Sequence, residues 1–233
     1  MTFSIAAICK KTNQLGVAVT TKVPAVGSLC PFVKAGVGAI ATQSFVNPYI
    51  GINGLKYLEQ GMTAQEVKEL LIKEDPEPSI RQFTVVDKNG NTVAFTGEQC
   101  DGWFGDVVGD GFAIAGNMLV GEKTILETQR GFEENQTLPL ADRLIKALEE
   151  GQAAGGDKRG RQSAAVLVYS SEDYPLVDLR VDEHEDPVSE LRRIYEVAKR
   201  ELFPFHGTLP TKANPKGKFD KETQKQIGIL IDQ

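Results

Sequence analysis

The chain has few of the residues that build metal sites, disulfide frameworks and histidine-based catalytic groups. Its 233 residues include three cysteines (Cys9, Cys30 and Cys100) and two histidines (His184 and His206). The cysteines are odd in number and show no C-x-x-C spacing, so neither a disulfide framework nor a zinc cluster is indicated. A Ser-His-Asp triad would need one of the two histidines, and the chain has no G-x-S-x-G elbow. We therefore expect no metal and no cofactor.

Long apolar runs are also missing. No stretch approaches the roughly 20 apolar residues that cross a bilayer, and the N-terminus lacks the basic start and apolar stretch of a secretory signal. The net charge of −6 argues against a general affinity for nucleic acid or anionic membranes. A hydrophobic content of 41% and a charged content of 25% are typical of a soluble globular protein. We expect a cytoplasmic protein that acts on a small molecule, with homo-oligomer formation left open.

Apolar periodicity predicts an α+β domain built in layers. The expected strands are 3–9, 15–20, 36–42, 81–86, 92–95, 107–115, 163–169 and 176–181, and the expected helices are 54–61, 63–74, 122–133, 139–150 and 187–202. Asn89-Gly90 between apolar runs is a hairpin signal, and Thr63 with Glu66 has the form of a capping box. Strand runs separated by helix pairs favour helices packed on largely antiparallel sheets. We expect residues 1–203 to form the domain and residues 204–233, rich in Pro, Lys and Gly, to form a loosely attached tail.

Thr2 is the first candidate for chemistry, because it directly precedes a strand-like run. If Met1 is removed, Thr2 carries both a hydroxyl nucleophile and a free α-amine that can accept its proton. An unperturbed α-amine has a pKa of roughly 7.7–8.0, close enough to neutrality for a general base. The alternative is an ordinary N-terminal threonine, since most chains that begin Met-Thr are not hydrolases.

Two basic features accompany Thr2. Lys34 precedes the third strand; beside a hydroxyl it would favour the ionised nucleophile, and otherwise it is a solvated surface lysine. The segment from Gly155 to Ser163 packs one carboxylate, three cations and three glycines into nine residues. Its Arg159 and Arg161 can offer guanidinium groups to a carboxylate substrate, while Asp157 or Ser163 can orient a terminal amine. A charged surface turn is the alternative. The segment precedes a strand and lacks the Lys-Ser/Thr pair, which argues against a phosphate loop.

Polar side chains near two strand ends complete the candidate set. Asn117 can donate its amide to an oxyanion or cap the following helix. Gln43, Ser44 and Asn47 follow the third strand and are expected to line a cleft. Gly36–Ala41 fits G-x-G-x-x-A, but a dinucleotide fingerprint opens a helix, whereas this motif coincides with the strand itself.

Several segments together resemble a known bacterial family, domain of unknown function 1028. They are Thr2-Phe3-Ser4-Ile5, Ala35–Gln43, Phe95-Thr96-Gly97, Gly116-Asn117-Met118-Leu119, Gly155–Ala165 and Asp178-Leu179-Arg180-Val181-Asp182. That family is grouped with the N-terminal-nucleophile hydrolases, which implies a four-layer αββα sandwich. It further implies Thr2 as nucleophile with its own amine as base, Lys34 by position, and Asn117, Asp157 and Ser163 as supporting residues. Some relatives carry a peptidoglycan-binding module, of which Gly217-Lys218-Phe219-Asp220-x-x-Thr223 resembles a short fragment.

Three hypotheses follow. The first is an amidohydrolase that uses Thr2 on a small amide or peptide-like substrate, with the cations at 158–161 favouring one that bears a carboxylate. The second is a non-catalytic ligand- or partner-binding sandwich that retains Met1. The third is a dinucleotide-dependent enzyme that uses the glycines at 36–41.

The first hypothesis makes a direct prediction about the N-terminus. We expect the intact mass of the purified protein to lack one methionine and its N-terminal peptide to begin at Thr2. Complete retention of Met1 would leave no free threonine amine and would contradict the amidohydrolase hypothesis.

Overall fold

The computed structural model describes residues 2–218, 220–226 and 228 of the chain. The protein divides into two compact units, residues 1–191 and 192–233. The domain boundary expected after residue 203 stays a prediction; the division between the two compact units falls within helix α5 (Pro187–Glu201). The second unit holds the rest of α5 together with α6 (Phe203–His206) and α7 (Lys221–Gln226). In the segment that resembles a peptidoglycan-binding fragment, Phe219 lies outside the described residues.

Two antiparallel sheets form the first unit. The six-stranded sheet has the order β10-β9-β2-β1-β8-β7, and the four-stranded sheet has the order β3-β4-β5-β6. The strands are β1 (Thr2–Cys9), β2 (Gln14–Thr21), β3 (Pro31–Lys34), β4 (Gly38–Ser44), β5 (Arg81–Asp87), β6 (Thr92–Thr96), β7 (Trp103–Gly109), β8 (Phe112–Leu119), β9 (Ser163–Tyr169) and β10 (Val177–Val181). Short 3-10 turns, η1 (Val26–Ser28) and η2 (Pro78–Ile80), precede β3 and β5.

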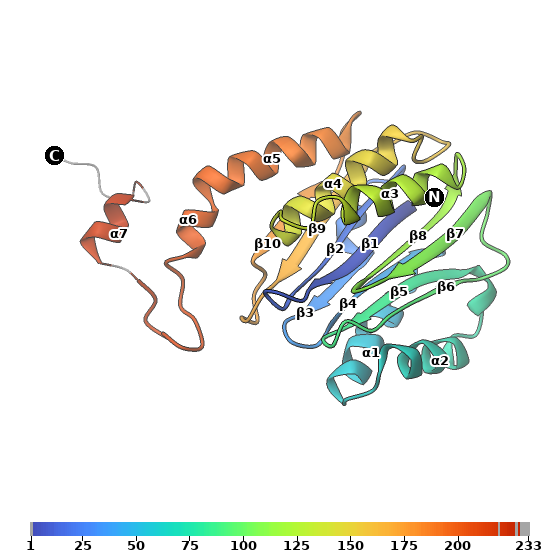
Figure 1. The fold of residues 1–233 in the computed structure, drawn as a ribbon, viewed down its shortest axis with the longest axis horizontal. Helices are drawn as coiled ribbons and strands as arrows, with labels where there is room; N and C mark the ends of the chain where they lie inside the picture. The colour runs from blue at the N-terminus through green and yellow to red at the C-terminus, as the bar shows by residue number, and fades with distance from the viewer. Residues whose placement is uncertain (1, 219, 227, 229–233) are drawn as a thin grey trace. The chain divides into compact units, whose positions relative to one another are not determined.

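Helices cover the outer face of each sheet. Helices α3 (Lys123–Glu133) and α4 (Leu140–Ala153) pack on the six-stranded sheet, while α1 (Pro48–Glu59) and α2 (Ala64–Glu74) pack on the four-stranded sheet (Figure 1). The layers therefore follow the order helix, sheet, sheet, helix. The expected α+β fold with two largely antiparallel sheets is confirmed.

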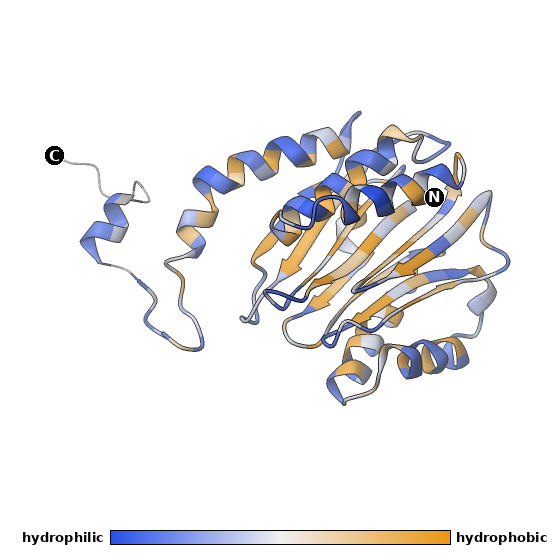
Figure 2. Ribbon diagram, viewed as in Figure 1, coloured by the Kyte–Doolittle hydropathy of each residue, from blue (hydrophilic) through white to orange (hydrophobic). Residues whose placement is uncertain are grey.

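The core follows the hydropathy of the strands, which are mostly apolar in Figure 2, whereas the helices alternate between apolar and polar residues. One apolar cluster lies between the sheets and includes Val17, Val19, Ala41 and Val86. A second, which includes Ile40, Leu58 and Val67, joins the four-stranded sheet to α1 and α2. In β1, seven of the eight residues are buried because the strand is central and covered on both faces.

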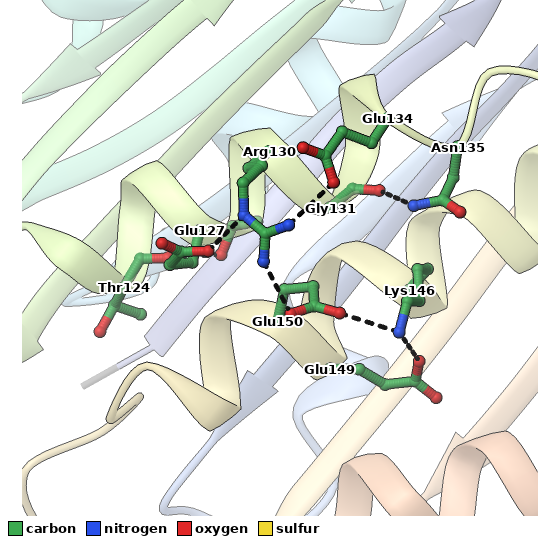
Figure 3. Close-up of polar contacts among 10 residues, drawn as sticks. Thr124, Glu127, Arg130, Gly131, Glu134, Asn135, Lys146, Glu149 and Glu150 are labelled. Atoms are coloured by element: carbon green, nitrogen blue, oxygen red, sulfur yellow. Dashed lines mark hydrogen bonds and ion pairs between the residues drawn. The ribbon is translucent and has the colours of Figure 1, made fainter.

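The outer surface of α3 and α4 carries an ion-pair network. Arg130 contacts Glu127 on α3, Glu134 at the C-cap of α3 and Glu150 on α4, and Lys146 contacts Glu149 and Glu150 (Figure 3). Exposed pairs of this kind contribute only about 0–1 kcal/mol each. The network therefore adds little beyond the burial of the apolar faces of the two helices.

Local signals explain most of the boundaries. The Thr63–Glu66 capping box is present, and the Asn89-Gly90 turn joins β5 to β6. The expected helix at 54–61 begins earlier, at Pro48, because Asn47 caps it and proline fits its first turn. The single strand expected at 107–115 is two strands, β7 and β8, joined by a turn in which Gly111 has φ 77°.

The dinucleotide hypothesis finds no support in this fold. Gly38–Ser44 is strand β4, which pairs with β3 and β5, so no helix begins at the glycine motif. No helix among the described residues is both long and apolar enough to traverse a bilayer.

Candidate functional site: Thr2 between the two sheets

Strand pairing places Thr2 at one end of the central strand. Thr2 begins β1 and lies opposite Thr21 of β2 and Asn117 of β8. Side chains of directly paired residues share a face of the sheet, as do residues two positions apart. Ser4 shares that face and contacts Gln43 of the other sheet. The side chains of Thr2, Thr21 and Asn117 therefore face the space between the sheets.

The hydroxyl of Thr2 has one partner from the neighbouring strand. Its Oγ1 lies 3.0 Å from Oγ1 of Thr21, and the two residues are 7% and 1% exposed. Either hydroxyl can donate in this pair. Thr2 thus presents a nearly buried hydroxyl that already has a polar neighbour.

A β-bulge sets the position of Asn117. The register between β7 and β8 shifts so that Asn117 and Met118 occupy the stretch opposite Phe104 alone. Met118 adopts a left-handed conformation with φ 52°, and its N–H donates to the carbonyl of Asp101 at 2.8 Å. Such a conformation is costly for a residue other than glycine and is found preferentially at functional sites.

A buried carboxamide cluster lies behind Thr2 and consists of Gln43, Gln82 and Asn117. Gln82 Oε1 accepts from Gln43 Nε2 at 2.8 Å and from Asn117 Nδ2 at 2.9 Å. Gln43 Oε1 accepts from Ser4 Oγ at 2.6 Å, and Gln43 Nε2 also lies 3.4 Å from the carbonyl oxygen of Thr2. All three side chains are at most 1% exposed. Gln43 is therefore a structural neighbour of Thr2 and not the open cleft residue we expected.

Asp157 lies in the α4–β9 loop and joins three segments near Thr2. The loop makes an isolated β-bridge between Asp157 and Leu119 of β8. The carboxylate accepts from the N–H of Lys22, which follows Thr21, at 3.1 Å, and from the N–H of Arg159 at 2.7 Å. Burial raises the pKa of Asp157 above its ordinary value, although the N–H and the charge of Arg159 oppose this effect.

Ser163 holds the β2–β3 loop. Its Oγ donates to the carbonyl of Val23 at 2.6 Å and accepts from the N–H of Val26 at 3.1 Å. The side chain is fully buried, and these two bonds engage its donor and one of its acceptor sites. The side chain of Ser163 is thus engaged in fixing the loop, whereas we expected it to orient a terminal amine or contact the substrate.

The cations of the 155–163 segment and Lys22, whose N–H contacts Asp157, divide into two groups. Arg159 pairs with Asp157, and Arg161 pairs with Asp186 at 2.9 Å, so both guanidinium groups have carboxylate partners. Lys22 and Lys158 make no ion pair within the part of the chain that the structure describes. Lys22 follows the partner of Thr2 on β2, and Lys158 donates its backbone N–H to Met118, which follows the partner on β8. Each lysine is therefore connected through the backbone to a strand that pairs with β1 at Thr2, and the amine of Lys22 lies 3.5 Å from the carbonyl of Arg161.

Lys34 does not lie beside Thr2, contrary to our expectation. It pairs with Gly38 at the start of β4, whereas Gln43, which contacts Thr2, lies at the other end of that strand. At about 3.3 Å per residue, the two ends are roughly 16 Å apart. The amine of Lys34 instead pairs with Glu59 at 2.6 Å on an exposed surface.

Ser44 and Asn47 belong to the β4–α1 loop. Ser44 has a left-handed conformation with φ 69°. Asn47 caps α1 by accepting from the N–H of Tyr49 at 3.0 Å, and it donates to Asp75 at 2.7 Å. Its side chain is engaged in capping rather than lining the space around Thr2.

Thr21 and Gln82 belong to the site but were not identified from the sequence. Thr21 could have been identified, because a hairpin around residues 10–13 places the end of its second strand opposite Thr2. Gln82 gave only a weak signal, a polar residue within the strand-like run 81–86. Its importance depends on the packing of one sheet against the other. Among the described residues, no group of three or more His, Cys, Asp or Glu side chains could hold a metal ion.

Comparison with protein families gives a match to a family of unknown function, DUF1028, over residues 2–191. The chain belongs to the DUF1028 family. The matched region begins at Thr2 and ends at Leu191, which is also the last residue of the first compact unit. No curated protein matches the chain.

Solved structures include a second member of this family. The crystal structure of protein SPO2555 from Silicibacter pomeroyi, described by the DUF1028 family model, is 27% identical with a TM-score of 0.87. That alignment covers 94% of this chain and 96% of the other. Anbu (ancestral beta-subunit) from Yersinia bercovieri is 12% identical with a TM-score of 0.39, over 89% of this chain and 98% of that one. A likeness at the latter level does not establish a shared fold.

The role of Ser163 can be tested by its removal. We expect Ser163→Ala to lower the free energy of unfolding by about 1–3 kcal/mol, because the N–H of Val26 and the carbonyl of Val23 lose a buried partner. Amide hydrogen exchange should quicken at Val26. Ser28→Ala is the control, since the hydroxyl of Ser28 donates to the carbonyl of Ala25 at an exposed position. Equal stability of the two variants would contradict the anchoring role.

Proposed function

We propose that this protein is an amidohydrolase of the N-terminal-nucleophile type, with Thr2 as its nucleophile. The observation that carries the proposal is the position of Thr2, which heads a central strand with its hydroxyl turned between two helix-covered sheets. Removal of Met1, which itself lies outside the described residues, would put a free amine on the same residue. Membership of the N-terminal-nucleophile hydrolases is part of this proposal.

The proposed reaction uses Thr2 twice. Its Oγ attacks the amide carbonyl while its amine takes the hydroxyl proton, and the tetrahedral intermediate then expels the leaving amine, which receives that proton. An ester between the acyl group and Oγ remains. A water molecule, deprotonated by the same amine, attacks the ester and releases the carboxylic acid and free Thr2.

Neighbouring residues support these steps in distinct ways. Thr21 Oγ1 can hold the hydroxyl of Thr2 in position for attack, given their separation of 3.0 Å. Asn117 retains one amide hydrogen that Gln82 does not use, and this hydrogen can stabilise the developing oxyanion. Asp157 fixes the backbone at Lys22, next to Thr21. Lys34 takes no part, so the amine of Thr2 acts as the base.

Substitution of Thr2 gives the central test. With the free N-terminus verified by mass, we expect Thr2→Ala to lower amide hydrolysis by about a thousandfold or more, as loss of a nucleophile does in other covalent hydrolases. Thr2→Ser keeps a hydroxyl and an amine and should retain activity. Thr21→Val should slow the reaction without abolishing it. Activity unchanged in Thr2→Ala, with the fold intact by circular dichroism, would end the proposal.

The substrate is proposed to carry a carboxylate, which Lys22 and Lys158 would attract. Succinamate and butyramide test this idea, because they are four-carbon amides that differ in a terminal carboxylate or methyl group. We expect kcat/KM for ammonia release to favour succinamate by about tenfold or more, the size of one charge-assisted hydrogen bond.

The double variant Lys22→Met/Lys158→Met should remove that preference and leave butyramide hydrolysis unchanged. Lys56→Met, which removes an exposed lysine of α1, is the matched control for loss of charge. A preference for succinamate that survives in the double variant would contradict the assignment of these lysines.

A further inference from the structure

We propose that Gln82 is the positioning residue of the Thr2 centre, and that it acts by fixing the carboxamide of Asn117. Gln82 reaches from β5 of the four-stranded sheet to β8 of the six-stranded sheet. Gln82 therefore links β8, the strand that pairs with β1 at Thr2, to the four-stranded sheet. This inference rests on the function proposed above.

The hydrogen bonds of Gln82 leave only one orientation for its side chain. Its Oε1 accepts from Gln43 and Asn117, and its Nε2 donates to the carbonyl of Gly116 and to Thr96 Oγ1, both at 2.9 Å. A flipped amide would set its NH₂ against two other NH₂ groups and its oxygen against the Gly116 carbonyl. Since a buried amide left without partners is costly, the network specifies the orientation of all three carboxamides.

The fixed orientation of the Gln82 amide determines which side-chain atoms of Asn117 remain available to Thr2. One N–H of Asn117 is donated to Gln82, and its side chain makes no other hydrogen bond within residues 2–218, 220–226 and 228. The second N–H and Oδ1 therefore remain for the amine of Thr2 or for an oxyanion. Because Gln82 holds Nδ2 in place, these remaining groups cannot exchange positions.

Gln82 also reaches Thr2 through a second route. Gln43 donates to Gln82 Oε1, accepts from Ser4 of β1 and lies 3.4 Å from the carbonyl of Thr2. The two neighbours of Gln82 thus contact β1 from the opposite sheet and from the adjacent strand. Loss of the Gln82 carboxamide would release both.

A simple acyl donor can test this inference without knowledge of the natural substrate. In 4-nitrophenyl acetate, Thr2 Oγ would attack the acetyl carbonyl, its proton would pass to the Thr2 amine, and 4-nitrophenolate would leave. The first product is O-acetyl-Thr2, which is counted as the hydroxylamine-labile acetyl group on the N-terminal peptide, because an acetyl group on the Thr2 amine resists hydroxylamine. The rate constant of acetylation at saturating probe and the half-saturating probe concentration are then measured separately.

We expect Gln82→Met to lower the saturated rate constant of Thr2 acetylation by about tenfold, with the half-saturating concentration unchanged. The matched control is Thr84→Val, which alters a fully buried residue two positions along the same strand. Within the described part of the chain, the hydroxyl of Thr84 has no hydrogen-bond partner, so this variant should acetylate within about twofold of the unaltered protein. A purely structural role for Gln82 would lower the melting temperature without moving the rate constant, and that result would overturn the inference.

The variant Thr96→Val provides a second test of the role of Gln82. If Gln82→Met does not fold, Thr96→Val removes one acceptor of Gln82 Nε2 and leaves the carboxamide in place; we expect acetylation about two- to fivefold slower. A rate equal to that of Thr84→Val would overturn the inference. Failure of the proposed function has a different signature, because the unaltered protein would then show no acetylation at Thr2 beyond that of its other hydroxyl groups.

Discussion

The pairing of β1 with both β2 and β8 is the constraint on which the rest of the site depends. A central strand has its hydrogen bonds and both its faces engaged, so its register cannot slip without turning every side chain to the opposite face. Thr2 is the first residue in that register. Its hydroxyl therefore lies between the sheets, although the residue is next to the chain terminus, where many proteins lack defined structure.

The interior around Thr2 differs from the rest of the inter-sheet space. Further along the same strands, the facing residues are alanines and valines such as Ala6, Val17 and Val86. At the Thr2 end, the sheets meet through glutamine, asparagine, serine and threonine side chains instead. Buried polar groups add less to stability than packed apolar ones unless each finds a partner. The carboxamide cluster achieves this through Gln82, and the result is a rigid polar wall beside the proposed nucleophile.

Much of this fold could be predicted from local patterns. The Asn89-Gly90 hairpin, the Thr63–Glu66 capping box and the long buried strands are short-range features, and the structure shows each of them. The expected single strand at 107–115 was wrong because Asp110 and Gly111 form a tight turn within an apolar run. The start of α1 was placed too late, since the Asn47-Pro48 pair was not interpreted as a helix cap. Beyond such boundaries, the short strand β3 and the strand β7 were not predicted as separate elements.

The sequence by itself determined the layered α+β class, the threonine at the head of a strand and the charged loop with Asp157. Only the tertiary structure decided which of the polar residues meet. It set Lys34 on an exposed surface, engaged Ser163 and Asn47 in backbone contacts, and brought Gln82 behind Asn117. The physical reason is that hairpins and caps depend on neighbours in the chain, whereas contact between two sheets depends on strand direction and packing between residues far apart in sequence.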